Sequence, residues 1–308
     1  MGTGERELGT RGATAVGALS MVFWGMIAGL ERLTTQAFGA QLGIGVIYLF
    51  AVPLAFALRR PERPSAYGWR YLLVSGLLFA ATDVFMGLGI GLAATPEQSV
   101  QVMIVNYLWP TLTVLGTLLA DGDAHASWLI VPGTLVATAG VATVVGGDAG
   151  LDLAAIAANV GSNPLPFALA LADAICWSAY SVVTPSISGG RDALPYCFAA
   201  TMLGGWGVWA ATSLALGPQL PVAPVTLASF AAPAASAVVL VLGYSCWNVG
   251  ILRGDAETLS MLSYATPVCS GVASALILGL SLAPSFYLGL ALVVAGSLLS
   301  LASTRERG

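Results

Sequence analysis

Residues 69–92 read WRYLLVSGLLFAATDVFMGLGIGL, an apolar run that contains a single acidic side chain, Asp83. A helix rises about 1.5 Å per residue, so this run can cross the hydrocarbon core of a bilayer, which is about 30 Å thick. An apolar stretch of about 18 residues or more is typical of a transmembrane helix. The segment therefore predicts a membrane-spanning helix that holds one acidic group.

Similar runs fill the chain from residue 13 to residue 303. Of the 308 residues, 57% are hydrophobic and 8% are charged, whereas a soluble domain carries about 25% charged residues. The sequence therefore predicts an all-α membrane protein. Charges, prolines and small polar residues divide it into ten predicted helices, at residues 13–35, 40–58, 69–92, 97–120, 127–147, 164–184, 193–216, 225–252, 256–280 and 284–303.

The arginines lie on one side of these predicted helices. With a cytoplasmic N-terminus, the inside segments contain Arg6, Arg11, Arg59, Arg60, Arg63, Arg70, Arg191, Arg253, Arg305 and Arg307. The positive-inside rule gives this asymmetry for an even number of helices with both termini in the cytoplasm. We therefore expect a multi-pass protein of the bacterial inner membrane. Arg32, near the outer side, is expected to form an interface pair with Glu31, with both side chains extending toward water.

The two halves of the chain, 13–147 and 164–303, echo each other. Three matches have the same order and a nearly constant offset: Phe23-Trp24-Gly25 with Cys176-Trp177-Ser178, Tyr107-x-x-Pro110 with Tyr264-x-x-Pro267, and Gly133 and Gly140 with Gly289 and Gly296. Each half holds five predicted helices, an odd number, so the second half begins on the opposite side of the membrane. The sequence therefore predicts an inverted repeat, which is common in secondary transporters whose site lies near the midplane.

The five-plus-five plan, the early tryptophans and the late prolines resemble the EamA family of the drug/metabolite transporter superfamily. The resemblance is most detailed at VNYLWP (105–110), WLIVPG (128–133) and WNVGIL (247–252). It implies a basket around a central cavity, lined chiefly by the first, third, fourth, sixth, eighth and ninth helices. It also implies export of aromatic and other neutral amino acids. The family pattern has an acid where this chain has Asp83, and a second acid where it has Gln101, so carboxylate-based coupling stays open.

Two acids, Asp83 and Asp173, lie well inside predicted helices. A charged side chain near the centre of a bilayer costs about 3 kcal/mol or more, so both should face the protein interior. Each fits a proton carrier or a partner for a substrate ammonium group. Each also fits a structural hydrogen bond to a neighbouring helix.

Polar and aromatic side chains share single faces of several predicted helices at helical spacing. One such face holds Trp24, Ile27 and Glu31. Mixed faces suit an amino acid, which has an apolar side chain and charged groups, although tryptophan and tyrosine near helix ends also anchor proteins at the membrane interface. The predicted substrate-binding residues are Trp24, Asp83, Asn106, Tyr107, Trp177, Tyr180, Trp247, Asn248 and Tyr264.

The fourth predicted helix offers two faces, one with Gln98, Gln101 and Trp109 and the other with Asn106, Tyr107 and Pro110. Spacing alone leaves open which face lines the cavity. Pro110 and Pro267 lie inside predicted helices, where proline removes a backbone hydrogen bond and can kink the helix. We predict both as gating hinges, with a static kink as the alternative.

Other functional classes fit less well. The basic residues form no cluster that could follow a phosphate backbone, which excludes nucleic-acid binding. Four cysteines lie in apolar runs without metal-ligand spacing, so neither a metal nor a cofactor is expected. HExxH and GxSxG motifs are absent, which argues against an enzyme, and no filter loop indicates a channel. A carrier for another small metabolite (a nucleobase, a drug or a non-aromatic amino acid) stays the alternative, with proton antiport and facilitated export both compatible.

Overall fold

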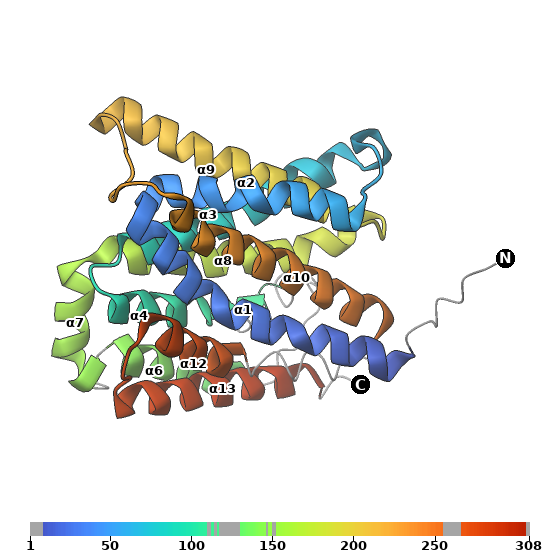
Figure 1. Cartoon of the computed structure of the whole chain (residues 1–308). Helices are drawn as coiled ribbons and strands as arrows, with labels where there is room; N and C mark the ends of the chain where they lie inside the picture. Colours follow the sequence, from blue (N-terminus) through green and yellow to red (C-terminus); the bar gives the residue numbers. More distant parts are fainter. Residues whose placement is uncertain are drawn as a thin grey trace.

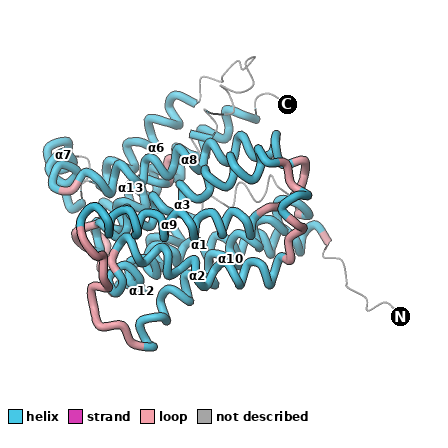
Figure 2. Tube along the Cα trace, turned by 90° about the horizontal axis from the view of Figure 1, so that it is seen from above, coloured by secondary structure: helices cyan, strands magenta, loops and turns pink. Residues whose placement is uncertain are grey.

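The computed structural model describes residues 9–109, 112–113, 116, 130–145, 147–149, 152–254 and 266–305, and this part of the chain is helical without strands. Figures 1 and 2 show the helices as one bundle. Its α-helices are α1 (Thr10–Phe38), α2 (Ala40–Arg59), α3 (Gly76–Leu92), α4 (Pro96–Asn106), α6 (Ile130–Val145), α7 (Leu153–Ser162), α8 (Pro164–Ser188), α9 (Leu194–Leu216), α10 (Ala231–Arg253), α12 (Thr266–Leu278) and α13 (Pro284–Arg305). A π-helical turn at Tyr71–Ser75 leads into α3, and a 3₁₀ turn at Leu227–Phe230 leads into α10.

Several helices meet the requirements for crossing a membrane. Within the described residues, five are long and apolar enough: Thr10–Phe38, Ala40–Arg59, Tyr71–Leu92, Pro164–Thr184 and Leu227–Trp247. Shorter apolar helices occupy Val131–Val145, Cys269–Leu278 and Pro284–Gly296. The protein is therefore a multi-pass, all-helical membrane protein. Each predicted run overlaps a described helix, while the count of ten spans stays a prediction.

One predicted connection contains a helix. Residues 148–163 were expected to form a loop because Asp148, Asp152 and Asn163 interrupt the apolar pattern. The structure instead places α7 there, since Asp152 Oδ1 accepts a hydrogen bond of 2.8 Å from the backbone N–H of Ala154, in the first turn. The polar residues therefore mark the two ends of a short helix, and Pro164 begins α8 directly afterwards.

Local sequence explains where other helices end. Gly39 separates α1 from α2 with a φ of 82°, a conformation that glycine adopts without the clash of a Cβ atom. At the start of α4, the hydroxyl of Thr95 accepts a hydrogen bond of 3.1 Å from Gln98 N–H, and Pro96 occupies the first turn. These caps keep α3 and α4 as two helices joined by a short turn.

The distribution of side chains is that of a protein in lipid. Large apolar side chains point outward, as at Leu203, which is 70% exposed, and Leu276, which is 78% exposed. Small hydroxyl residues are fully buried between helices, including Ser20, Thr34 and Thr201. Lipid accepts the outer apolar surface. Thr34 donates to the carbonyl of Leu30 on its own helix, while Thr201 contacts Asp83 on α3.

The helices pack in a regular pattern. Helix α1 packs on α10 and α12, α3 packs on α8 and α9, and α2 lies against α9 and α10. Helices α6 and α13 form a separate, close pair (Figure 1). A Cβ atom added to Gly140 would lie 2.6 Å from the carbonyl oxygen of Gly289, and the reverse distance is also 2.6 Å. Only glycine therefore allows these two backbones to touch.

One end of the bundle carries ion pairs between loops. The beginning of α1, the end of α13 and the connections after α2 and α8 lie at this same end (Figure 1). Here Arg59 pairs with Asp192, and Arg191 pairs with Glu62 at 2.7 Å. Tyr71 accepts a hydrogen bond of 3.0 Å from the N–H of Ala193. The two connections are therefore bound to each other beside the helix ends.

Candidate functional site

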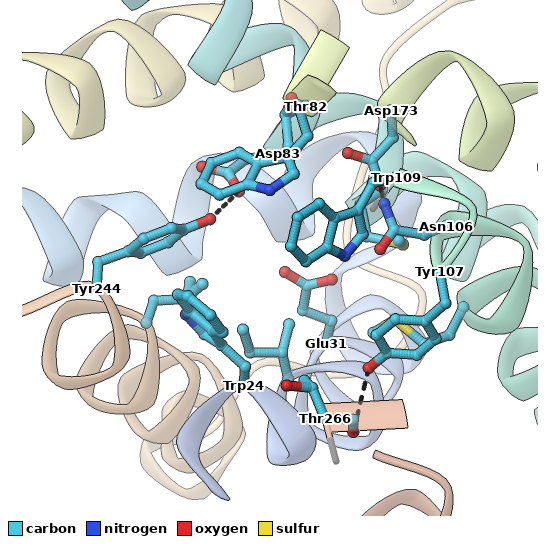
Figure 3. A pocket seen from close by; sticks show the side chains of 15 residues that line it. Trp24, Glu31, Thr82, Asp83, Asn106, Tyr107, Trp109, Asp173, Tyr244 and Thr266 are labelled. Carbon is cyan, nitrogen blue, oxygen red and sulfur yellow. Dashed lines mark hydrogen bonds between the residues drawn. The ribbon is translucent and has the colours of Figure 1, made fainter. Parts of the chain in front are cut away.

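A cavity lies in the middle of the bundle, between helices from both halves of the chain (Figure 3). Its walls come from α1, α3, the end of α4 with the turn after it, α8, α10 and α12. The lining residues are Trp24, Ile27, Glu31, Thr82, Asp83, Met86, Met103, Asn106, Tyr107, Trp109, Asp173, Trp177, Leu240, Tyr244 and Thr266.

Aromatic rings form much of the wall. The ring of Trp24 lies 5.4 Å from that of Tyr244 and 5.3 Å from that of Trp247, measured between ring centroids. Across the cavity, Trp177 stacks on Tyr180 at 5.2 Å with an interplanar angle of 16°. Such contacts add stability beyond the burial of area and fix the rings in place. The cavity therefore has rigid, flat apolar surfaces that suit an aromatic group.

Asp83 on α3 is held by hydroxyl groups from three other helices. The hydroxyl of Tyr48 donates to Asp83 Oδ2 at 2.5 Å, and that of Tyr244 donates to Oδ1 at 3.4 Å (Figure 3). Thr201 adds a longer contact of 3.5 Å to Oδ2. Both oxygens of this carboxyl are therefore engaged, and we call Asp83 the anchored carboxyl.

Asp173 on α8 is held on one side only. Its Oδ2 accepts a hydrogen bond of 2.6 Å from the amide of Asn106, while its side chain is only 1% exposed. Within the described residues, Oδ1 of Asp173 is buried and has no hydrogen-bond partner. Oδ1 of Asp173 is thus buried away from water and receives no hydrogen bond from the described residues.

Glu31 on α1 also lines the cavity, contrary to the expected interface pair. It is 5% exposed, and its carboxyl points into the space between Trp24, Trp109 and Tyr107 (Figure 3). Arg32 turns away, because its guanidinium donates to the carbonyl oxygens of Ile90 at 3.1 Å and Ala93 at 2.8 Å. The expected pair of Glu31 and Arg32 is therefore wrong: Arg32 fastens the end of α3 and leaves Glu31 to the cavity.

Glu31 and Asp173 share one property. In the part of the chain that the structure describes, neither Glu31 Oε2 nor Asp173 Oδ1 receives a hydrogen bond. We call these two residues the open carboxyls. Carboxyl groups thus enter one cavity from three helices. No group of three His, Cys, Asp or Glu side chains among the described residues could hold a metal ion.

The predicted site residues divide into three groups. Trp24, Asp83, Asn106, Tyr107 and Trp177 line the cavity. Tyr180 and Trp247 lie behind the lining, against Trp177 and Trp24. Pro110, Tyr264 and the side chain of Asn248 lie outside the described residues, and Pro267 is buried in the first turn of α12.

The structure resolves which part of the fourth predicted helix faces the cavity. Asn106, Tyr107 and Trp109 all contribute to the lining, at the point where α4 ends and the N–H groups of Tyr107 and Leu108 donate to the third residue before them. Gln101 points elsewhere, since its Oε1 accepts a hydrogen bond of 2.8 Å from Asn159 on α7. Trp109 therefore lines the cavity, whereas Gln101, which shares a helix face with it by spacing, does not.

Several lining residues were absent from the predicted set. Glu31 shares a helix face with Trp24, and Asp173 is an acid inside an apolar run, so both had a signal in the sequence. Tyr244 lies three residues before Trp247 and four before Asn248, about one helical turn, and had the same kind of signal. Thr82, Met86 and Met103 had none, because such residues are as common in helix–helix contacts as in cavities.

Known proteins are similar in sequence to this chain over most of its length. The aromatic amino acid exporter YddG of Salmonella typhimurium is 36% identical over 296 residues, which cover 96% of this chain and 98% of the relative. YddG of Escherichia coli is 36% identical over 297 residues, with the same coverage. YddG of Ancylobacter novellus is 27% identical and covers 84% of this chain and 86% of the relative.

The fold and a family model agree with these relatives. A crystal structure that is 22% identical in sequence superposes with a TM-score of 0.64 over 96% of this chain and 99% of the other, which supports the fold alone. The model of the EamA-like transporter family matches residues 165–302. The chain therefore belongs to the EamA-like transporter family, and within it to the family of the bacterial YddG proteins.

Proposed function

We propose that the protein is a secondary transporter that exports aromatic and other neutral amino acids across the bacterial inner membrane. The observation that carries the proposal is the central cavity, where rigid aromatic walls surround carboxyl groups with open oxygens. Relatives that share 36% of the sequence over 98% of their length are named as aromatic amino acid exporters, which supports the same class of cargo. No catalytic step and no cofactor enter this proposal.

The cavity suits both ends of an aromatic amino acid. An aromatic side chain can pack against Trp24, Trp177 and Tyr244, which supply flat apolar surfaces. The ammonium group can meet a carboxyl or the face of a ring, since cations are attracted to both. We infer that the lining residues bind the substrate directly, and that Tyr180 and Trp247 hold the rings that do so.

Transport requires that the cavity open in turn to each side, and an inverted repeat provides the means. In the proposed repeat, residues 13–147 correspond to 164–303, so α1, α3 and α6 correspond to α8, α10 and α13. The packing of α1 on α10 then corresponds to that of α3 on α8, and α6 packs on its own equivalent. This exchange is the pattern expected for two halves related by an axis in the membrane plane.

The contact of α6 with α13 supports the same repeat. A Cβ atom on Gly140 would meet the carbonyl of Gly289, and one on Gly296 would lie 2.6 Å from the carbonyl of Gly133. Exchanging the two halves turns the first contact into the second, which is the property of a two-fold interface. Pro110 and Pro267 occupy corresponding places in the sequence repeat and stay our proposed hinges.

We further propose that the ten predicted helices all span the membrane and that both termini are cytoplasmic. The arginine-bearing connections after α2 and α8 lie at the same end as the start of α1 and the end of α13 (Figure 1), which supports this orientation. Proton antiport and facilitated export both fit the cavity, because it contains carboxyls that can either carry protons or only bind the substrate.

Uptake into proteoliposomes tests the function. Labelled phenylalanine would be offered with and without a pH gradient, against empty liposomes and against excess unlabelled amino acids and nucleobases. We expect saturable uptake that other aromatic amino acids inhibit, and stimulation by the gradient would identify proton coupling. Inhibition by a nucleobase or a drug, with no uptake of phenylalanine by folded protein, would replace the proposed cargo by another metabolite.

A further inference from the structure

The open carboxyls are buried groups whose hydrogen bonding within the described residues is incomplete. Glu31 is 5% exposed and Asp173 is 1% exposed, and one oxygen of each lacks a hydrogen-bond partner among the described residues. Burying a carboxylate without a hydrogen-bond donor is strongly unfavourable. Natural structures rarely leave buried polar groups unsatisfied without a structural or functional reason.

Asp83, the anchored carboxyl, shows that a buried acid in this protein can have both of its oxygens hydrogen-bonded. Tyr48, Tyr244 and Thr201 together engage both oxygens of Asp83. Glu31 has the opposite surroundings: its neighbour Arg32, which could have paired with it, donates instead to the backbone of α3 and the turn after it. Among the described residues, the buried carboxyl oxygens without a donor therefore belong to Glu31 and Asp173, and both acids line the cavity.

The charges of the lining residues indicate which chemical group of a ligand the open carboxyls would bind. No arginine, lysine or histidine occurs among the described lining residues, and the internal stretches outside the described part contain no arginine or lysine in their sequence. The neutral polar atoms left without a described partner in the lining are Trp24 Nε1 and Thr82 Oγ1. A ligand ammonium would thus meet charged acceptors, whereas a ligand carboxylate would meet only neutral groups.

We propose that Glu31 and Asp173 together bind the ammonium group of the ligand, and that the ligand's carboxylate is dispensable. An ammonium group has three donors, enough to serve both open oxygens at once. The site then accepts aromatic primary amines as well as aromatic amino acids, and it rejects aromatic acids that lack an amine. The inference rests on the proposed function for the identity of the cavity as the substrate site.

Equilibrium binding to the purified protein tests this with three ligands of one shape. Phenylalanine has both charged groups, phenethylamine lacks the carboxylate, and 3-phenylpropionate lacks the ammonium. Labelled phenylalanine and labelled phenethylamine are measured separately, and 3-phenylpropionate competes with each. We expect both labelled ligands to bind with affinities within about tenfold of each other, and 3-phenylpropionate to compete at least about 100-fold more weakly, since it loses charge-assisted hydrogen bonds.

Variants locate the effect. Glu31→Gln and Asp173→Asn keep the shape of each side chain and remove its charge, and each should weaken both labelled ligands at least about tenfold. Glu97→Gln and Asp148→Asn are matched controls, because these acids are exposed and lie outside the cavity lining; they should bind as the unaltered protein does. Thermal unfolding of each variant verifies that it is folded.

The outcomes separate this inference from the proposed function. Equal competition by 3-phenylpropionate, or unaltered binding by both Glu31→Gln and Asp173→Asn, would overturn the ammonium site. Binding of phenylalanine but not of phenethylamine would also overturn it, while the amino acid function would stand. Binding of phenethylamine but not of phenylalanine would support the ammonium site and overturn amino acids as the cargo. Binding of neither by folded protein would contradict both.

Discussion

Two acidic regions of one cavity differ in how the protein treats a buried carboxyl. Around Asp83, hydroxyl groups from α2, α9 and α10 engage both oxygens. Around Glu31 and Asp173, one oxygen on each side chain has no donor in the described part of the chain. The first region holds four helices together at one point. The second region gives up stability that a ligand can restore.

This difference assigns separate tasks to residues of the same type. A fully satisfied polar network makes the local structure rigid, whereas an incomplete one is unfavourable until something completes it. The fold is therefore expected to depend on Asp83, and ligand binding on Glu31 and Asp173. A variant of Asp83 that changed only ligand binding, or a variant of Glu31 or Asp173 that changed only stability, would contradict this assignment.

The largest effect is expected for Asp83→Ala. This change leaves the hydroxyl groups of Tyr48 and Tyr244 without their shared acceptor and opens a small cavity, so stability should fall by about 3 kcal/mol. Thermal unfolding of the purified protein in detergent measures the loss. A melting temperature equal to that of the unaltered protein would show that the hydroxyl cluster around Asp83 does not hold the helices.

Glu31→Gln should show the opposite balance. We expect ligand affinity to fall by about 1.4 kcal/mol or more, which corresponds to tenfold. The stability of the empty protein should stay the same or rise by about 1 kcal/mol, because a neutral amide is less costly to bury than an unpartnered carboxylate. Binding and melting measured on the same preparation test both signs. A fall in stability of the size expected for Asp83→Ala would remove the distinction between the two regions.

Tyr48→Phe sharpens the comparison on the anchored side. It removes one hydrogen bond to Asp83 and keeps the ring, which packs at 5.6 Å from the ring of Phe198. A buried hydrogen bond contributes about 1 kcal/mol, so stability should fall by about that amount. Ligand affinity should change less than threefold, because Tyr48 does not belong to the described cavity lining. A tenfold loss of affinity without loss of stability would show that the hydroxyl network around Asp83 serves ligand binding more than the fold.

The smallest effect is expected for Trp247→Phe. Trp247 lies behind the cavity wall, against Trp24 at 5.3 Å between ring centroids. The change keeps an aromatic contact, so affinity should shift by less than about 0.5 kcal/mol. Trp24→Phe is the matched comparison, because Trp24 itself lines the cavity. Equal losses in the two variants would show that the inner and outer rings act as one unit.

Much of the architecture followed from the sequence by itself. Apolar runs long enough for a bilayer predict helices wherever they occur, because a backbone in lipid must satisfy its own hydrogen bonds. Each predicted segment accordingly overlaps a described helix, and the resemblance to the EamA family is confirmed by relatives. Helix α7 was missed because Asp152 begins a helix by capping it and does not interrupt it, a distinction that depends on one hydrogen bond.

The site was only partly visible in the sequence. Helical spacing brought Trp24, Asn106, Tyr107 and Trp177 to faces that do line the cavity. Spacing along one helix could not show that Gln101 accepts a hydrogen bond from Asn159 on α7 and stays out of the cavity lining.

What only the tertiary structure decided is which buried acid has partners. Composition and periodicity determined that this chain is a helical membrane protein with acids inside its helices, because each helix depends mainly on its own stretch of sequence. The donors to Asp83 come from Tyr48, Thr201 and Tyr244, on three helices far apart in the chain. The diversion of Arg32 from its neighbour Glu31 depends on carbonyl groups near the end of α3. Hydrogen bonds act over about 3 Å, so only the packing of helices determines which acids are satisfied and which remain open.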